Sequence, residues 1–555
     1  MGQHILIQLF EIPLFILVFV FLFYLPGKFL IYKLKLKTEA LEDIFISSSV
    51  GILFFTLLLY LLAWVNLEKI SIFLYLLIDF WIIKQKRFFP EKLSTIEAKP
   101  LVVVFLLSLV FSTSMLVTGI FGDTFIYRRD DIWHLALINE LKENFPPFNP
   151  GFADLPLKGY HFFYNFLIAK ISSLSFVSPT SLHFHFFPIM IAFLWGIGVY
   201  GLLRKWSKKK EVGLWGVFLT MFGGSFAFTL LLKGHSGFSL DSAFGMWQPT
   251  SWLYNPPLAI SMIFIILFIF VLYNYLETRN KNWLFIISLV VGLTAMFKVY
   301  GGIVLFAGFG LLFLRELLIK RNFTIIIHAF LIAFIFIGTY WLFVGNSGSL
   351  IFYPLWAPHS ILQNFPWYGF EEKMYTYKKL SVIKGILEVE SYGLIIYIFG
   401  NLGIRTIGLI GAFLFFVHEK RKNGFFLILL ISICLVSLFV PLLFIQSIKV
   451  FEITQMTAYF LFISAIIGSF GFAYFFNLLK IKILQIAAFI IILIIALPSA
   501  YESFVGFSNV HLIGVKISDP YFESMNYLKS DKNYFSTVLE IPGPFYLHSV
   551  IKGHF

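Results

Sequence analysis

The chain has 555 residues, of which 59% are hydrophobic, 20% aromatic and only 13% charged, and its mean hydropathy is +0.87. A typical soluble domain carries about 25% charged residues, so this composition excludes a soluble globular protein, a disordered chain and a nucleic-acid-binding domain. Apolar runs of about 20 residues recur along nearly the whole chain, which is typical of a polytopic helical membrane protein. The net charge of +13 comes from basic clusters between these runs, so it indicates orientation in the bilayer. The only cysteine, Cys434, lies in an apolar run, which excludes an internal disulfide and a Cys-based metal site.

The basic clusters predict the topology, because Lys and Arg concentrate in short cytoplasmic loops. We assign to the cytoplasmic side the clusters Lys33–Lys37, Lys84–Arg87, Arg204–Lys210, Arg279–Lys281, Arg315–Arg321, Lys420–Lys422 and Lys480–Lys482. Threading apolar segments between them gives about fourteen transmembrane helices with both termini outside. The predicted spans are 5–32, 44–65, 68–84, 100–119, 181–203, 212–233, 254–276, 283–299, 301–318, 323–345, 391–417, 424–445, 454–479 and 483–500. The first span lacks a small-residue cleavage site, so we interpret it as an anchor.

One further apolar segment, residues 160–178, would invert every later basic cluster if it crossed the membrane. We therefore predict that it is a juxtamembrane or re-entrant helix on the outer face, with Lys170 extending its ammonium group to the interface.

The remaining polar segments then all lie outside the cytoplasm: 120–180, 234–253, 346–390, 446–453 and 501–555. We predict a transmembrane domain over 1–500, with 120–180 as its catalytic first large outer loop and 346–390 as its second. Residues 501–555 form a short extracytoplasmic C-terminal segment, in which a helix and a strand would make a small α/β appendage. No Gly-rich phosphate loop precedes a helix, which argues against a nucleotide-driven enzyme or pump.

The first outer loop holds the most chemically suggestive residues. Its charged and imidazole side chains are Asp123, Arg128, Arg129, Asp130, Asp131 and His134. Apolar residues recur at helical spacing at Ile132, Leu135, Ile138 and Leu141, which predicts an amphipathic helix along the membrane surface, beginning near Asp130. Asp130 and Asp131 point in different directions on such a helix, whereas His134 shares a face with either. A non-helical loop, Pro146–Pro156, follows, and Tyr160 and His161 open the next helix.

A purely structural explanation of each carboxylate stays open. Asp130 is a good N-cap and complements the helix dipole, and charge in an outer loop can simply be solvated. The cluster as a whole favours function, because acidic, basic and imidazole groups crowd the rim of a bundle that otherwise has few charges.

The order of these features resembles a known family. A DD pair in the first large outer loop is followed by a His, an amphipathic helix, the stretch FPPFNPGFADLPLKGYHFFYN and another apolar helix. This resembles bacterial multi-pass glycosyltransferases of the GT-C superfamily, in the group related to protein O-mannosyltransferases and lipid A aminoarabinose transferases. The resemblance is specific over residues 123–165 and architectural elsewhere. It implies an all-α GT-C-like bundle that moves a sugar, usually with inversion, from a polyprenyl phosphate to an acceptor outside the cytoplasm. The acidic motif of the family matches Asp130 and Asp131 by position and type.

The chemistry of such a transfer suggests roles for these residues. A carboxylate with an ordinary pKa of about 4 is ionised at neutral pH and can accept the proton of an attacking hydroxyl. Either Asp131 or Asp130 would be this base, and the other would orient the acceptor or bind a divalent cation such as Mg²⁺ or Mn²⁺. His134 would hydrogen-bond the base or the acceptor.

The leaving phosphate needs a cation, and Lys298 in TAMFKVYGG is the main candidate. A Lys within an apolar helix costs roughly 2.5–3.5 kcal/mol on insertion scales, although a Lys at the interface is the simpler alternative. Arg128, Arg129 and His161 are further candidates for the donor phosphate. For acceptor binding we single out Asp241, Trp247 and Tyr160, while noting that interfacial Trp is common in membrane proteins.

The predicted protein is a multi-pass enzyme of the plasma membrane with its active site on the extracytoplasmic face. Its partners are a polyprenyl-phosphate-linked sugar, a lipid, glycan or protein acceptor, and the bilayer, with no nucleic acid. The alternatives are a flippase or exporter of lipid-linked saccharides, which should carry functional groups along its core and on both sides, and a polymerase or ligase, which should use basic residues of the 346–390 loop.

Overall fold

Helices make up almost all of the structure. The computed structural model describes residues 2–85, 98–120, 126–127, 129–152, 155–235, 237–343, 349–418, 424–508 and 515–516. Nine helices in these ranges are long and apolar enough to cross a membrane, or up to ten if one sharply bent pair counts as a span. The chain is therefore an all-α polytopic membrane protein, as the sequence predicts.

The longer helices, in chain order, are α1 Gly2–Val18, α2 Leu25–Lys33, α3 Ala40–Ala63, α4 Ser71–Lys84, α5 Ala98–Ile120, α6 Arg129–Glu143, α7 Phe163–Ser175, α9 Phe187–Ser207, α10 Lys210–Phe222, α13 Pro256–Thr278, α14 Asn282–Phe297, α15 Val299–Leu314, α16 Thr324–Thr339, α17 Trp356–Gln363, α18 Phe370–Lys379, α19 Ile383–Ile395, α20 Arg405–His418, α21 Gly424–Leu443, α22 Thr457–Leu478 and α23 Lys482–Ser508. Short helices are α8 Pro179–Ser181, α11 Phe228–Leu232 and α12 Pro249–Trp252, and the strands are β1 Ile126–Tyr127, β2 Leu350–Phe352, β3 Phe444–Gln446 and β4 Val515–Lys516. Wider π-type turns continue several helices, as at Phe19–Tyr24 between α1 and α2.

The predicted count of about fourteen spans is not confirmed. Three of the predicted spans correspond to α4, α10 and α14, which have 14, 13 and 16 residues. At about 1.5 Å per residue, such helices are shorter than the roughly 30 Å hydrocarbon core. The predicted 391–417 span is broken instead, because the helical segments Ile383–Gly400 and Arg405–His418 meet at 85°. The side chains of α5 are described only as far as Thr113, and this part, Ala98–Thr113, is one of the shorter apolar helices.

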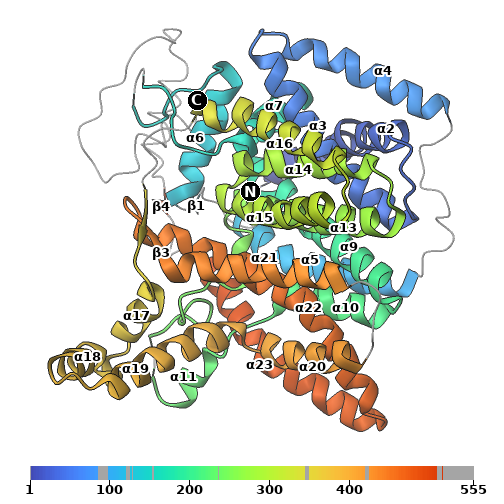
Figure 1. The fold of residues 1–555 in the computed structure, drawn as a ribbon. Coiled ribbons are helices and arrows are strands. Elements are labelled where there is room, and N and C mark those ends of the chain that lie inside the picture. Colours follow the sequence, from blue (N-terminus) through green and yellow to red (C-terminus); the bar gives the residue numbers. More distant parts are fainter. Residues whose placement is uncertain are drawn as a thin grey trace.

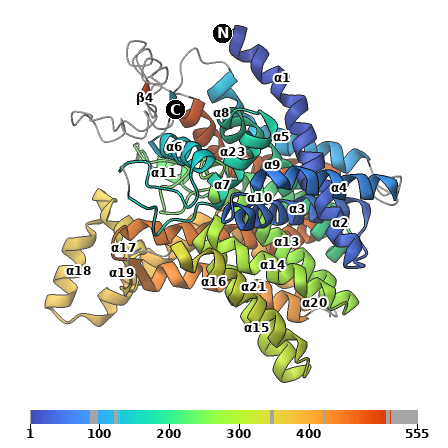
Figure 2. The same cartoon turned by 90° about the horizontal axis from the view of Figure 1, so that it is seen from above.

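Helix α13 forms the centre of the bundle. It is apolar all round, its membrane window is entirely buried, and it packs against α3, α9, α14 and α15. Helices α16 and α23 lie at the periphery with most of their apolar surface exposed. In both ribbon views α18 and α19 project from the bundle (Figures 1 and 2).

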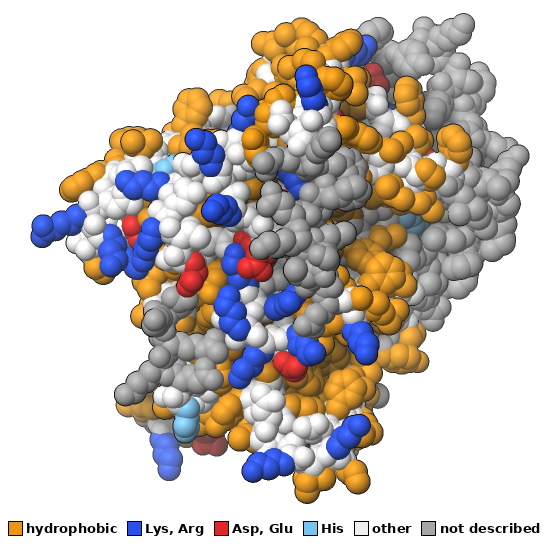
Figure 3. Space-filling view, turned by 90° about the vertical axis from the view of Figure 1, so that its right-hand side faces the viewer, with side chains coloured by type: hydrophobic (Ala, Val, Ile, Leu, Met, Phe, Trp, Pro, Cys, Tyr) orange, Lys and Arg blue, Asp and Glu red, His pale blue; other side chains and the backbone are white. Residues whose placement is uncertain are grey.

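Among the described residues, several segments assigned to the cytoplasmic side meet at one end of the bundle, which we call the inner end. Glu42 of α3 accepts bonds there from Lys205 Nζ at 2.7 Å and from the Asn274 amide. Asn282 Nδ2 donates to Leu34 O at 2.8 Å, which joins the turns before α14 and α3. Figure 3 shows that Lys and Arg gather on the face at the right-hand side of Figure 1, where acidic groups are sparse.

Described parts of the segments assigned to the outside meet at the opposite end, which we call the outer end. Strand β1 of the first loop pairs with β4, and β2 of the second loop pairs with β3. The loop before α12 contacts the end of α23, where Asp241 N donates to Glu502 Oε2 at 2.8 Å. This grouping agrees with the predicted topology, while the side of the membrane that each end faces stays a prediction.

Helix α7 has 13 residues and is too short to cross, in line with the predicted non-crossing segment. Lys170 is buried and pairs at 2.9 Å with Oε1 of Glu68, which lies in the turn between α3 and α4. Helix α23 runs to Ser508, past the predicted end at 500. Apart from α23 and β4, the predicted 501–555 appendage lies outside the described residues.

Helices α20 and α22 touch through glycines. An added Cβ at Gly471 would lie 1.9 Å from Gly408 O, and one at Gly408 would lie 2.8 Å from Gly468 O. Small residues let membrane helices approach until their backbones are in contact, so these positions fix how α20 sits on α22.

We expect Gly471→Ala to destabilise the protein by about 2 kcal/mol or more, because the methyl group must push the two backbones apart. Gly310→Ala in α15 is the matched control, since an added Cβ there meets nothing within 4 Å. Thermal unfolding in detergent should show a lower Tm for the first variant only. Equal Tm values for both variants would contradict this packing.

Candidate active site

The acidic pair lies on the first turn of α6, which begins at Arg129, one residue from the predicted start. The backbone of Asp130 and Asp131 is described, but the side chains of Arg129, Asp130 and Asp131 are outside the described part. Asp123 and Arg128 lie outside the described residues altogether. The structure therefore places the backbone of Asp130 and Asp131 at a helix start, and the contacts of their carboxylates stay predictions.

His134, one turn further along α6, is buried against α7. Asn165 Nδ2 donates to His134 O at 3.1 Å and lies 3.0 Å from His134 Nδ1, and Asn165 Oδ1 lies 3.4 Å from the same nitrogen. The amide of Asn165 therefore holds the imidazole ring in place through Nδ1.

A second histidine lies behind the first. The His183 ring centroid is 5.5 Å from that of His134, and the hydroxyl of Tyr164 is 3.2 Å from His183 Nδ1. The sequence analysis missed Asn165, Tyr164 and His183. The two histidines in the apolar run LHFHF could have indicated this contact, because polar side chains buried in such a run need hydrogen-bond partners.

Lys298 occupies a break between two membrane helices. Helix α14 ends at Phe297 and α15 begins at Val299, and Lys298 between them is extended, with φ −157° and ψ 116°. An added Cβ at Gly302 would lie 2.7 Å from the Ala295 side chain, so this glycine lets α14 and α15 meet closely at the break. The Lys298 side chain is 5% exposed, and its ammonium lies 5.7 Å from the centroid of the Tyr300 ring.

His161 lies close enough to both Lys298 and His134 to feel their charges. Its ring keeps partial contact with solvent but is densely surrounded by protein, and the pKa of His161 is lowered well below its usual value. Burial is the main cause, followed by the positive charge of Lys298 and the proximity of His134. The structure therefore brings together three predicted site residues that come from α6, the start of α7 and the α14–α15 break.

Tyr160 completes the wall of this cluster. Its ring stacks on His161 with centroids 4.6 Å apart, and the Trp133 ring lies 4.4 Å away on the other side. A half-buried aromatic platform of this kind suits the flat apolar face of a sugar ring. The predicted contribution of Tyr160 to acceptor binding is consistent with this position and remains untested.

Asp241 belongs to a different network. Its carboxylate accepts bonds from Ser251 Oγ at 2.6 Å, Ser503 Oγ at 3.1 Å and Gln248 N at 3.2 Å. Burial raises the pKa of Asp241 to about 7. These bonds tie the 239–253 loop to α23, so the oxygens are already engaged. Trp247 is exposed, and its carbonyl oxygen accepts from Trp252 Nε1 at 2.9 Å.

No group of three or more His, Cys, Asp or Glu side chains is placed to hold a metal ion among the residues that are described. Because that set does not include the side chains of Asp130 and Asp131, a divalent cation at the acidic pair stays a prediction.

No protein-family model matches the chain, and no curated protein matches it in sequence. Similar solved structures include the Archaeoglobus fulgidus oligosaccharyltransferase in the apo form, with a TM-score of 0.46, 14% identity and coverage of 82% of this chain and 63% of that one. The same enzyme tethered with an acceptor peptide containing the NVT sequon has a TM-score of 0.46 and 15% identity, with coverage of 82% of this chain and 63% of that one. Archaeal oligosaccharyltransferase AglB from Archaeoglobus fulgidus, in complex with an inhibitory peptide and a dolichol-phosphate, has a TM-score of 0.43 and 13% identity, with coverage of 79% of this chain and 58% of that one.

The chain thus spans less than two thirds of the length of these structures. A likeness of this degree does not assign a function. It also does not confirm the predicted subtype, the bacterial O-mannosyltransferases and aminoarabinose transferases.

We expect His161 to stay neutral in the folded protein while the unfolded chain protonates it below about pH 6.5. Folding stability should therefore be lost as the pH falls below that value, by up to about 1.4 kcal/mol per pH unit from this residue. His161→Gln should reduce the fall in Tm between pH 7.5 and pH 5.5, and the exposed His418→Gln should not. The same fall in all three proteins would show that the imidazole titrates normally.

Proposed function

We propose that the protein is an inverting GT-C type glycosyltransferase. It takes a sugar from a polyprenyl phosphate and transfers it to an acceptor on the extracytoplasmic face of the plasma membrane. One observation carries this proposal: a buried Lys298, at a break between two membrane helices, shares a cluster with His161 and with His134 of the helix on which the acidic pair stands.

The acidic pair supplies the base. The acceptor oxygen attacks C1 of the sugar, the bond from C1 to the phosphate oxygen breaks, and the hydroxyl proton passes to the carboxylate of Asp131 or Asp130. The other carboxylate orients the acceptor or binds a divalent cation, and the negative charge of both stabilises positive charge that develops on the sugar ring. His134, held by Asn165 through Nδ1, would hydrogen-bond the base or the acceptor through Nε2.

The basic residues bind the leaving phosphate. Lys298 directly precedes the span Val299–Ile319, so its ammonium stands at the end of a membrane helix, where the phosphate of a polyprenyl donor would lie. A neutral His161 beside it can donate one hydrogen bond without adding charge. Arg128 and Arg129 precede the acidic pair in sequence and would bring further positive charge to the same phosphate.

The alternatives are a flippase or exporter and a polymerase or ligase. The described cluster lies at one end of the bundle, an arrangement that favours chemistry at one membrane face over passage through the core. A polymerase would use the second loop, where His359 Nε2 and Glu390 Oε2 are 2.6 Å apart. The length of the product distinguishes the enzymes, because a transferase adds one sugar and a polymerase builds a series.

The double variant Asp130→Asn with Asp131→Asn should lose sugar transfer by about a hundredfold or more, since removal of the base contributes on that scale. The assay is transfer of labelled sugar from polyprenyl phosphate donors to membrane acceptors. Glu143→Gln removes one carboxylate charge at the exposed end of the same helix and should remain active. Undiminished transfer by the double variant, at normal membrane levels, would overturn the catalytic assignment.

A labelling experiment tests the orientation of the site. In a Cys434→Ala background, Asn144→Cys places a thiol at the exposed end of α6, and Lys281→Cys places one at the inner end. A membrane-impermeant maleimide should label the first variant in intact cells and the second only after lysis. Labelling of the second variant alone in intact cells would place the acidic pair in the cytoplasm and remove the case for a lipid-linked donor.

A further inference from the structure

A cavity of about 380 Å³ opens at the inner end, far along the chain from the acidic loop. It lies between the first turn of α3 and the last turn of α9. Its polar side chains are Glu39, Glu42, Arg204, Lys205 and Lys208, and the Phe270 ring of α13 forms an apolar wall.

The two carboxylates in this cavity are already engaged. Glu42 is buried and accepts from Lys205 and from Asn274. The Glu39 side chain accepts from the backbone of Glu42, and Glu39 N donates to Glu42 Oε2 at 3.0 Å, a reciprocal capping box. The start of α3 is therefore satisfied by its own residues and does not itself attract an anion.

Two cations remain available. Arg204 and Lys208 line the cavity, and neither has an ion pair or a side-chain hydrogen bond to another described residue. Arg204 stands in the last turn of α9, and Lys208 caps that helix in the left-handed conformation with φ 61°. A planar guanidinium beside an ammonium is a combination that recognises phosphate oxygens.

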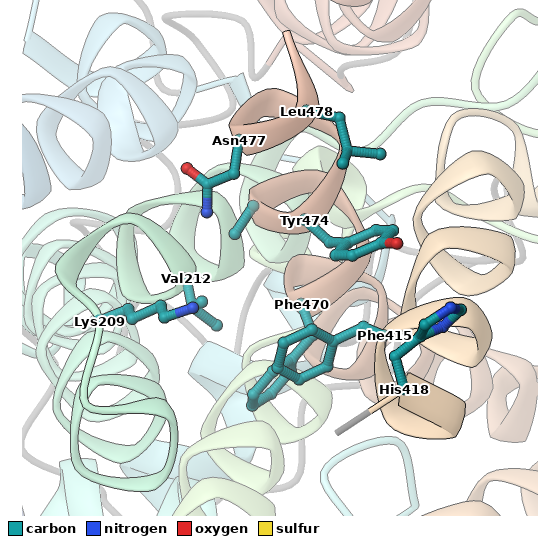
Figure 4. A pocket seen from close by; sticks show the side chains of 9 residues that line it. Lys209, Val212, Phe415, His418, Phe470, Tyr474, Asn477 and Leu478 are labelled. Atoms are coloured by element: carbon teal, nitrogen blue, oxygen red, sulfur yellow. The ribbon is translucent and has the colours of Figure 1, made fainter. Parts of the chain in front are cut away.

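The neighbouring Lys209 faces a different environment. From the same turn it enters a second cavity of about 180 Å³, whose opposite wall consists of the Phe415, Phe470 and Tyr474 rings (Figure 4). The second cavity is mainly apolar. In the turn between α9 and α10, Lys209 therefore lines an apolar cavity, whereas Lys208 lines the polar one. The polar cavity is the one suited to an anion.

The position of the polar cavity favours a lipid over a free ion. Helix α9 belongs to the span Pro179–Ser207, and the cavity begins where that span ends. Phe270 supplies apolar surface beside the two cations, and the surrounding face is rich in Lys and Arg (Figure 3). Anionic phospholipids concentrate in the cytoplasmic leaflet and attract basic residues just outside a span.

We propose that this cavity binds the phosphate of an anionic phospholipid headgroup, held by Arg204 and Lys208. The site is separate from the proposed sugar-transfer site, and either can fail without the other.

The test uses the full chain in a zwitterionic detergent, with phosphatidylglycerol as the probe and thermal unfolding as the readout. Phosphatidylglycerol should raise the Tm in a saturable way, and phosphatidylcholine or inorganic phosphate at the same concentration should not. In Arg204→Gln with Lys208→Gln the half-saturating lipid concentration should rise at least roughly tenfold, because two charge-assisted hydrogen bonds are lost.

The matched control is Lys320→Gln with Lys480→Gln, which removes the same charge from exposed positions at the inner end but outside the cavity. This variant should respond to phosphatidylglycerol as the wild type does. If it weakens the response as much as the cavity variant does, diffuse attraction explains the binding and the site is refuted. An equal response to inorganic phosphate refutes the lipid as the ligand. If the double cavity variant unfolds, the exposed Lys208→Gln alone should still weaken the response severalfold, and an unchanged response refutes the site.

Discussion

A polar group in a bilayer has to find its partner within the protein, and this constraint organises the whole molecule. At the inner end the charged groups of different helices satisfy one another. Lys28 of α2 pairs with Asp43 of α3 at 2.6 Å, Lys205 of α9 pairs with Glu42 of α3 at 2.7 Å, and Tyr275 of α13 donates to Glu316 at 2.7 Å. Each of these buried contacts joins two different helical segments, so together they set how the helices are aligned along the membrane normal.

The same requirement explains the bend before α20. Arg405 is fully buried there, and its guanidinium donates to Gln248 Oε1 at 3.0 Å and to the carbonyl oxygen of Gly223. Gln248 N in turn donates to Asp241. The broken helix frees backbone and side-chain polar groups, and the 239–253 loop enters the bundle and bonds several of them, including Asn401 O and the Asn401 amide. Asp241 therefore has a sufficient structural role in this network, which its sequence context alone did not indicate.

The sequence could predict the features that depend on local pattern. Apolar length gives most spans, basic clusters give the grouping of the loops, and the start of α6 follows from Asp130 and the spacing of the apolar residues after it. It could not predict features that depend on tertiary partners. The break at Lys298 sets the length of α14. The partners of Arg405 determine the bend before α20, and Glu68, in another loop, determines the role of Lys170. Asn165 and His183 were missed for the same reason, because the role of an amide or an imidazole depends on the residue that it contacts in the fold.

The break at Lys298 shows how a polar residue is accommodated between two apolar helices. The backbone keeps its hydrogen bonds there, because Lys298 N donates to Thr294 O at 2.8 Å and Gly302 N donates to Lys298 O at 3.1 Å. A buried ammonium at a membrane helix end is costly, and its positive charge helps to keep the neighbouring His161 neutral. In the proposed reaction a lipid phosphate at this place would meet the ammonium and a neutral imidazole together, so the same residues that terminate α14 would also receive the leaving group.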